Sequence, residues 1–247
     1  MFDANCHLQF DALWDDRAPI WQRAVDAGVS QAVVSSDVLT AERLVRLERL
    51  AAEGRVIAAG WHPLFPRARA ALKILANCFA AHPDWGLGEV GIDTRHQPMA
   101  DQAEFLSDQM DLAQGRFCVL HAVGPSSLDA ALSVAKQHSI RGAVHAFNGS
   151  WQQAQQWLDL GWYLSIGGPV VNPAATRLAE WVEKVPEDRL LIESDAPDLP
   201  PHGWQGHNEP ASLALVAKRV AQVRGVGVDA ISQSTARNTS RWILGSA

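Results

Sequence analysis

Cysteine is scarce in this chain, and the cysteines that occur follow no pattern of paired bridges or paired ligands. Cys6, Cys78 and Cys118 are an odd number of residues at wide spacings. A disulfide framework needs pairs of cysteines, and a zinc finger needs closely spaced Cys or His pairs, so the sequence argues against both. We expect three reduced, buried thiols in a cytoplasmic protein.

Positive charge is also in short supply. Lys and Arg total 21 against 27 Asp and Glu, which gives a formal net charge of −6. This balance argues against a broad basic surface that would hold duplex DNA through its phosphates. A nucleic-acid substrate stays open, because a bound metal ion can itself recruit a phosphate group.

The chain has no uninterrupted apolar run long enough to span a membrane and no basic segment followed by an apolar stretch at its start. It also contains no linker, low-complexity segment or block of like charge that would divide it. We therefore expect a soluble, cytoplasmic protein without membrane contact, folded as one domain over residues 1–247. The proline-rich stretch 196–210 follows the last expected strand and is interpreted as an active-site loop.

Short apolar runs alternate with longer amphipathic ones along the whole chain. The apolar runs predict strands at 1–7, 31–35, 56–60, 86–92, 117–121, 142–147, 162–166 and 190–194. Several are nearly continuous in apolar or β-branched residues, which is typical of strands buried on both faces. Helices are expected at 40–52, 67–81, 103–113, 128–138, 151–160, 174–184, 210–223 and 229–244. About eight strand–helix repeats favour an α/β fold of the closed (β/α)8 TIM-barrel type over an open sheet.

Imidazoles and carboxylates recur at or near the ends of these strands. They are His7, His62, Glu89, Asp93, His121, His145 and Asp195. The carboxyl ends of all strands in a parallel barrel converge on one rim, so these side chains are predicted to lie together. Such groups are suitable ligands for Zn²⁺ or Mn²⁺, and a metal ion there can activate water and bind a phosphoryl oxygen. One histidine at a strand end is usually an ordinary polar residue; the recurrence at strand after strand favours a metal site.

The segments that carry these residues resemble the successive motifs of the TatD family. They read DANCHL at 3–8, GWHP at 60–63, GEVGID at 88–93, LH at 120–121, HAFNGS at 145–150, SIGG at 165–168, ESDAP at 193–197 and NEP at 208–210, with Asn238. The resemblance covers essentially the whole chain. It implies a metal-dependent hydrolase of ester bonds with a (β/α)8 barrel, a phosphodiesterase or deoxyribonuclease acting on DNA ends or single-stranded DNA. Its cofactor would be one or two divalent ions, Mg²⁺, Mn²⁺ or Zn²⁺.

The resemblance also implies a role for each residue that matches a motif. His7 and Asp195 would bind a first metal ion, and Glu89 would bridge it to a second. His121 and His145 would complete the second set of ligands. The catalytic residues would be Glu89 and Asp195, with Asp195 orienting or deprotonating the attacking water.

The chain departs from the family pattern at two positions. The first motif is usually H-x-H, and here Asn5 stands two residues before His7. Residues i and i+2 of a strand share a face, so Asn5 should still point into the site, as a weak or lost ligand for the first metal. Family members also typically carry arginine two residues after His121, where this chain has Val123. That change removes a bidentate phosphate contact.

Three further residues are expected to contact substrate. His62 would lie at the rim near the phosphate, and Trp61 and Trp204 lie in predicted rim loops, where a flat ring can stack on an unpaired base. The expected partner is DNA or a nucleotide, bound by a monomer. Two alternatives stay open: a barrel that acts on another small ester or amide, and a degenerate family member with only a metal-binding or interaction role.

Overall fold

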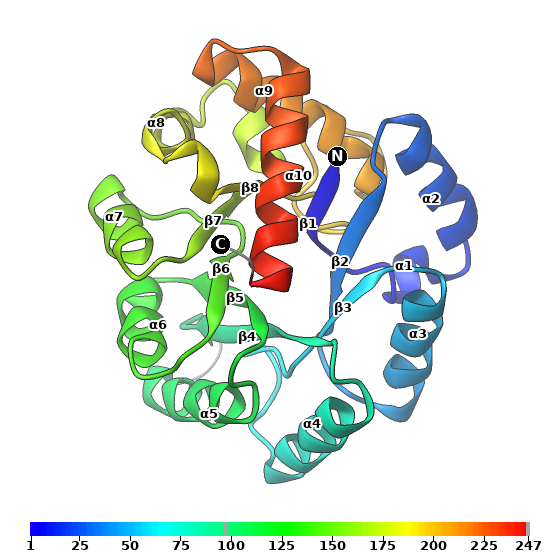
Figure 1. The fold of residues 1–247 in the computed structure, drawn as a ribbon, viewed down its shortest axis with the longest axis vertical. Coiled ribbons are helices and arrows are strands. Elements are labelled where there is room, and N and C mark those ends of the chain that lie inside the picture. Colours follow the sequence, from blue (N-terminus) through cyan, green and yellow to red (C-terminus); the bar gives the residue numbers. More distant parts are fainter. Residues whose placement is uncertain (96–97, 246–247) are drawn as a thin grey trace.

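Eight parallel strands form the centre of the molecule. The computed structural model describes residues 1–95 and 98–245. The strands are β1 (Phe2–Cys6), β2 (Gln31–Ser35), β3 (Val56–Ala59), β4 (Gly86–Asp93), β5 (Phe117–Val123), β6 (Arg141–Val144), β7 (Tyr163–Ile166) and β8 (Leu190–Ile192). Each strand pairs in parallel with the next, and together they form a nearly closed barrel surrounded by helices (Figure 1). The expected (β/α)8 barrel is confirmed.

Helices occupy every connection between strands and surround the barrel, and two more α-helices follow β8 (Figure 1). They are α1 (Asp11–Trp14), α2 (Arg17–Asp26), α3 (Ala41–Ala52), α4 (Arg69–Ala81), α5 (Met99–Leu112), α6 (Ser127–Ala135), α7 (Trp151–Asp159), α8 (Thr176–Lys184), α9 (Leu213–Arg224) and α10 (Val228–Leu244). Three short 3-10 helices, η1 (Gly168–Val171), η2 (Glu187–Arg189) and η3 (Pro210–Ser212), complete the described elements. In residues 1–95 and 98–245, no helix combines the length and apolar character needed to cross a membrane.

Helices α3 to α10 match the expected segments, whereas α1 and α2 lie outside the sequence-based prediction. Helix α1 has only four residues, and Pro19 stands in the first turn of α2. Proline is tolerated there but signals a turn in the sequence. Where helices were expected, local caps help to fix their starts: the Thr40 hydroxyl accepts the Arg43 N–H, and Ser150 and Gln153 form a capping box at α7.

Backbone hydrogen bonds between β1 and the chain that follows β8 bring the two ends of the sheet together. The Asp195 N–H donates to the Asn5 carbonyl at 2.9 Å, and the His7 N–H donates to the Ala196 carbonyl at 2.7 Å. Because the closure runs through these residues, it sets Asn5, His7 and Asp195 side by side at the carboxyl end of the barrel.

Alternation along β5 shows which side chains point into the barrel. Phe117 and Val119 belong to an inner buried cluster, whereas Cys118 and Leu120 belong to the larger cluster between barrel and helices. Side chains two residues apart in a strand share a face, so His121 continues the inward series. The same strand therefore supplies core packing at its start and a cleft residue near its end.

Helix α10 covers the amino-terminal end of the barrel. Its Trp242 is buried, contacts Phe117 with ring centroids 5.2 Å apart, and donates its indole N–H to the Arg141 carbonyl at 2.9 Å. Phe117 and Arg141 are the first residues of β5 and β6. With this end closed, the carboxyl end of the barrel is the end that can hold a site.

Candidate metal centre

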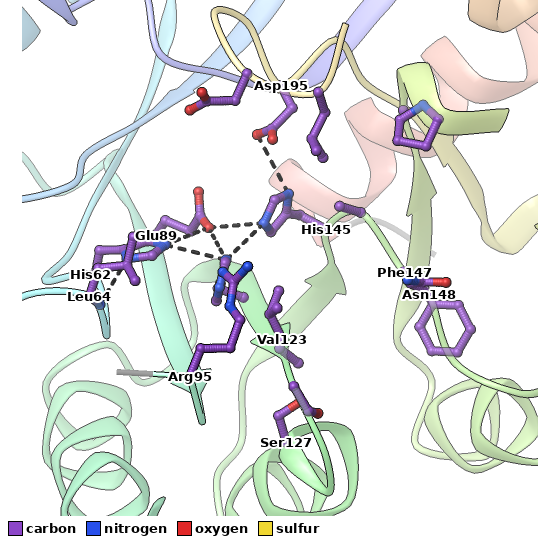
Figure 2. Close-up of a pocket in the computed structure, with 18 of the residues that line it drawn as sticks. His62, Leu64, Glu89, Arg95, Val123, Ser127, His145, Phe147, Asn148 and Asp195 are labelled. Atoms are coloured by element: carbon purple, nitrogen blue, oxygen red, sulfur yellow. Dashed lines mark hydrogen bonds and ion pairs between the residues drawn. The ribbon is translucent and has the colours of Figure 1, made fainter. Parts of the chain in front are cut away.

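A cleft of about 880 Å³ opens over the carboxyl ends of the strands. Six of the residues expected there from the sequence line it together, whereas the expected Asp93 and Asn5 are buried and do not: the six are His7, His62, Glu89, His121, His145 and Asp195. Figure 2 shows His62 and His145 directed toward Glu89, and Asp195 directed toward His145. The barrel thus gathers side chains that are up to 188 residues apart in sequence, as from His7 to Asp195 (195 − 7).

Both carboxylate oxygens of Glu89 face histidines. Oε1 lies 2.7 Å from His121 Nδ1, 2.9 Å from His145 Nε2 and 3.1 Å from His62 Nε2. Oε2 lies 3.3 Å from His7 Nε2. Burial raises the pKa of the Glu89 carboxyl, but the surrounding imidazoles outweigh burial and hold that pKa well below its usual value. Each oxygen of this ionised carboxylate can therefore join a separate group of metal-ligating atoms.

Two of the histidines have their outward nitrogens engaged with oxygen atoms. His7 Nδ1 lies 2.9 Å from the Ser35 carbonyl oxygen, and His121 Nε2 lies 3.2 Å from Asp93 Oδ2. An imidazole that donates from one nitrogen keeps a lone pair on the other. His7 Nε2 and His121 Nδ1, the nitrogens that face Glu89, are thereby set up as metal ligands.

His145 is oriented in a similar way by Glu193. Its Nδ1 lies 3.4 Å from Glu193 Oε1, the same oxygen that accepts the Ala146 N–H at 2.6 Å. The Asn5 amide nitrogen is also 3.4 Å from this Nδ1, but the carboxylate is the stronger partner for a ring N–H. Ala146 has φ +43°, a conformation rare outside glycine, and β6 ends before it, earlier than the expected end at residue 147. The backbone leaves the strand where His145 must face the cleft.

The nearby carboxylates also raise the proton affinity of these imidazoles. Burial by itself lowers the pKa of His7, His121 and His145, but carboxylates including Glu89 outweigh burial and raise all three pKa values. A metal ion needs the neutral imidazole, so it competes with protons for the same lone pairs.

His62 belongs to the cluster in space but is set up as a hydrogen-bond donor. The Leu64 N–H donates to His62 Nδ1 at 3.1 Å, which leaves the proton of the neutral ring on Nε2, directed at Glu89. Burial lowers the pKa of His62 and so favours this neutral ring. Although His62, Glu89 and His121 lie close enough to hold an ion, His145 is the better third ligand, since its inward nitrogen carries a lone pair.

The donors therefore form two groups that share Glu89. His7, Glu89 and Asp195 have ligand atoms within 4.8 Å of one another, with His7 Nε2 3.4 Å from Asp195 Oδ1. His121 and His145 form the second group with the other Glu89 oxygen. Imidazole and carboxylate sets of this kind fit divalent ions such as Zn²⁺ or Mn²⁺.

A family model described as TatD related DNase matches residues 2–244. The chain belongs to this family. Its relatives include the metal-dependent hydrolase YjjV of Escherichia coli, 30% identical over 96% of this chain and 95% of YjjV. The metal-dependent hydrolase YabD of Bacillus subtilis is 29% identical over 98% of each chain. The crystal structure of YjjV matches with a TM-score of 0.91 over 99% of this chain and 98% of that chain. This TatD-family protein is thus a metal-dependent hydrolase.

A more distant structure shares the TatD-family fold. The TatD family protein of Entamoeba histolytica has a TM-score of 0.82 at 18% identity, over 100% of this chain and 98% of its own. At that identity the match supports the barrel and its connections alone.

Asn5 stands where the TatD family usually has histidine, and its amide faces Asp195. The Asn5 Nδ2 group donates to Asp195 Oδ1 at 3.0 Å, and Asn5 Oδ1 accepts the Ser35 hydroxyl at 2.6 Å. An ionised carboxylate can only accept hydrogen bonds, which fixes the amide with its NH₂ group toward Asp195. Since the amide oxygen points at Ser35, Asn5 orients Asp195 but provides no metal ligand to the group formed by His7, Glu89 and Asp195.

Asp195 is held in the cleft by an uncommon backbone conformation. Its φ is +57°, and its N–H is tied to the Asn5 carbonyl. Strand β8 ends at Ile192, before the expected end at residue 194. The early departure from extended backbone turns the carboxylate toward His7 and His145, and strained positions of this kind cluster at functional sites.

The structure does not bring the two expected tryptophans into the cleft. Neither Trp61 nor Trp204 is among the described residues that line it. Their indole N–H groups donate to the carbonyl oxygens of Pro66 at 3.2 Å and of His207 at 2.9 Å. These hydrogen bonds hold each ring within its own loop, so the placement gives no support to stacking on a base.

Other cleft residues were missed by the sequence-based reasoning. Phe10 stacks on His7 with ring centroids 4.6 Å apart, and Arg95 stands at the rim beside Val123 (Figure 2). Both lie in loops, where no periodicity marks a functional side chain. Glu193 could have been found, because it precedes Asp195 by two residues within the motif ESDAP.

Proposed function

We propose that this protein is a phosphodiesterase that cleaves single-stranded DNA or DNA ends. The observation that carries the proposal is the pair of donor groups that share Glu89, with His7 and Asp195 on one side and His121 and His145 on the other. Two adjacent metal positions suit displacement at phosphorus, because one can serve the attacking oxygen and the other the leaving oxygen. The description of the family as TatD related DNase also supports it.

A divalent ion in this centre would supply Lewis-acid polarisation of a phosphoryl oxygen and activation of water. The chain's own residues then divide the remaining work. Asp195, oriented by Asn5, accepts the proton of the attacking water. His62 donates its Nε2–H to Glu89 Oε1 and so helps to hold that carboxylate in place, and Phe10 packs on His7 and limits the access of bulk water.

The test is cleavage of end-labelled single-stranded DNA with Mn²⁺, Mg²⁺, Zn²⁺ or a chelator. We expect metal-stimulated cleavage that falls by about 10²–10⁴-fold in Asp195→Asn, the range for loss of a general base. Asp188→Asn is the matched control, because Asp188 lies in η2 before β8, at the opposite end of that strand, and should leave the rate unchanged. Full metal-dependent cleavage by both Asp195→Asn and Glu89→Gln would contradict the proposal.

A different small ester or amide is the second candidate, and the apolar wall of the cleft favours it. Val123, Leu128, Phe147 and Leu178 line one part of the cleft. Such side chains contact the apolar part of a substrate and offer no hydrogen bonds to phosphate. Bis-(p-nitrophenyl) phosphate and p-nitrophenyl butyrate, assayed side by side, separate the candidates: a higher kcat/KM for the carboxyl ester would favour the second.

A further inference from the structure

One cation stands among the carboxylates of the cleft. Of the described residues that line it, Arg95 alone is an arginine or lysine, whereas Asp37, Glu89, Asp195 and Asp198 are acidic. Carboxylates at this density repel an anionic substrate, so a positioned cation has a function there beyond the metal centre.

Asp93 fixes the Arg95 side chain with three hydrogen bonds. Arg95 Nε donates to Asp93 Oδ1 at 2.9 Å, Nη2 donates to Oδ2 at 2.6 Å, and the Arg95 backbone N–H donates to Oδ1 at 3.1 Å. The same Oδ2 atom lies 3.2 Å from His121 Nε2. One carboxylate therefore orients both a metal-facing imidazole and the guanidinium, which sets their relative position.

The pairing with Asp93 leaves most of the guanidinium available. An arginine side chain carries about five N–H hydrogens, and the contacts to Asp93 use two of them. The Arg95 side chain is 55% exposed while that of Asp93 is fully buried. Figure 2 shows Arg95 reaching from the end of β4 toward the histidine cluster. The remaining hydrogens can bind a second anion without breaking the Asp93 pair.

Arg95 lies at the edge of the apolar wall. Asp93 and Val123 are register partners in the β4–β5 pair, and the Thr94 N–H donates to the Val123 carbonyl at 3.0 Å. Val123, Leu128 and Phe147 belong to the apolar lining of the cleft, and Figure 2 shows Val123 beside Arg95. A cation and an apolar surface thus adjoin each other next to the metal centre.

We propose that Arg95 binds the anionic group of the substrate, a phosphate, while Val123 and Leu128 contact the apolar or planar group attached to it. The cleavage of such a substrate rests on the proposed function, but its binding does not. In this chain the guanidinium would come from Arg95, just after β4, because position 123 at the end of β5 is a valine.

Binding of inorganic phosphate to the Mn²⁺-loaded protein, followed by calorimetry, tests the proposal without turnover. We expect Arg95→Met to weaken phosphate binding by about tenfold or more at unchanged Mn²⁺ content, since a charge-assisted hydrogen bond is worth roughly that factor. The phosphate affinity of Arg95→Lys should lie between those of Arg95→Met and the wild type, because lysine keeps the charge but lacks the planar guanidinium. Arg49→Met is the matched control: Arg49 on α3 is 60% exposed and pairs with Glu53 just after that helix, so the substitution should leave phosphate binding unchanged.

A second variant separates binding from support of the metal centre. Adding Val123→Arg to Arg95→Met should recover most of the phosphate affinity, because it returns a guanidinium to the adjoining strand end. Unchanged phosphate affinity in Arg95→Met would overturn the proposal, and so would a loss that is matched by loss of Mn²⁺. If no ester is cleaved by any variant, the proposed function fails while the phosphate titrations still decide the role of Arg95.

Discussion

Replacing Asn5 with histidine changes an amide that orients Asp195 into an imidazole that can bind a metal ion. In the native chain, the Asn5 NH₂ group is committed to Asp195 and its oxygen to Ser35. The first donor group therefore consists of His7, Glu89 and Asp195. Asn5→His should raise the affinity of this position for Mn²⁺ or Zn²⁺.

The size of the effect follows from the metal ligand that the substitution adds and the hydrogen bond that it removes. A four-ligand zinc site is worth about 10–16 kcal/mol at neutral pH, or roughly 2.5–4 kcal/mol for each ligand. Loss of the hydrogen bond from Asn5 to the charged Asp195 costs about 1.5–3 kcal/mol of the free energy that holds this ligand in place. The net gain in binding free energy is about 1 kcal/mol, which corresponds to roughly fivefold tighter binding of the ion.

The assay is calorimetric titration of Mn²⁺ into the wild-type protein, Asn5→His and Asn5→Ala. Asn5→Ala loses the same hydrogen bonds but adds no donor, so its first position should bind about ten- to a hundredfold more weakly than in the wild type. Equal Mn²⁺ affinity in Asn5→Ala and Asn5→His would contradict the expectation that a histidine at position 5 adds a metal ligand, and an affinity of Asn5→Ala equal to wild type would contradict the support of Asp195 by Asn5.

Three other predictions concern the pH dependence of metal binding, the pH dependence of stability, and the part played by Trp61. Metal affinity should rise with pH in direct titrations and should keep rising above the ordinary imidazole pKa of about 6.5, because carboxylates outweigh burial and raise the pKa of His7, His121 and His145, and the ion needs their neutral forms. Burial raises the pKa of Asp3 to about 8, so the folded chain holds a proton there that the unfolded chain releases above about pH 4. This group should lower the free energy of unfolding as pH rises from about 4 to 8, by at most about 1.4 kcal/mol per pH unit, and Asp3→Asn should remove that slope in urea titrations. Trp61→Phe should leave DNA cleavage within about twofold of wild type in a steady-state assay, because the ring does not line the cleft.

Much of the barrel could be predicted because buried parallel strands are nearly continuous in apolar residues. The expected segment 31–35 coincides with β2. The predictions overshoot at β6 and β8, where Ala146 and Asp195 adopt positive φ and end the strands early. Nothing local in the sequence marks these two conformations, because contacts from Glu193 to Ala146 and from the Asn5 backbone to Asp195 hold them in place.

For the site, strand-end reasoning brought the imidazoles and carboxylates to one rim but could not assign their proton positions. The tautomer of His62 depends on the Leu64 N–H, and the direction of the Asn5 amide depends on Ser35 in another strand. Neither contact has a signature in the sequence. Arg95 was missed for a similar reason, because its place follows from the β4–β5 register.

The most direct test of a metal centre built around Glu89 is the metal content of the purified protein after dialysis against Mn²⁺ or Zn²⁺. The wild-type protein should retain about one or two equivalents. Glu89→Gln should retain almost none at the same free metal concentration, because it removes the ionised oxygens that both donor groups share. Glu42→Gln, an exposed partner of Arg46 on α3, serves as the control and should match the wild type. Equal metal content in Glu89→Gln and the wild type would contradict the account.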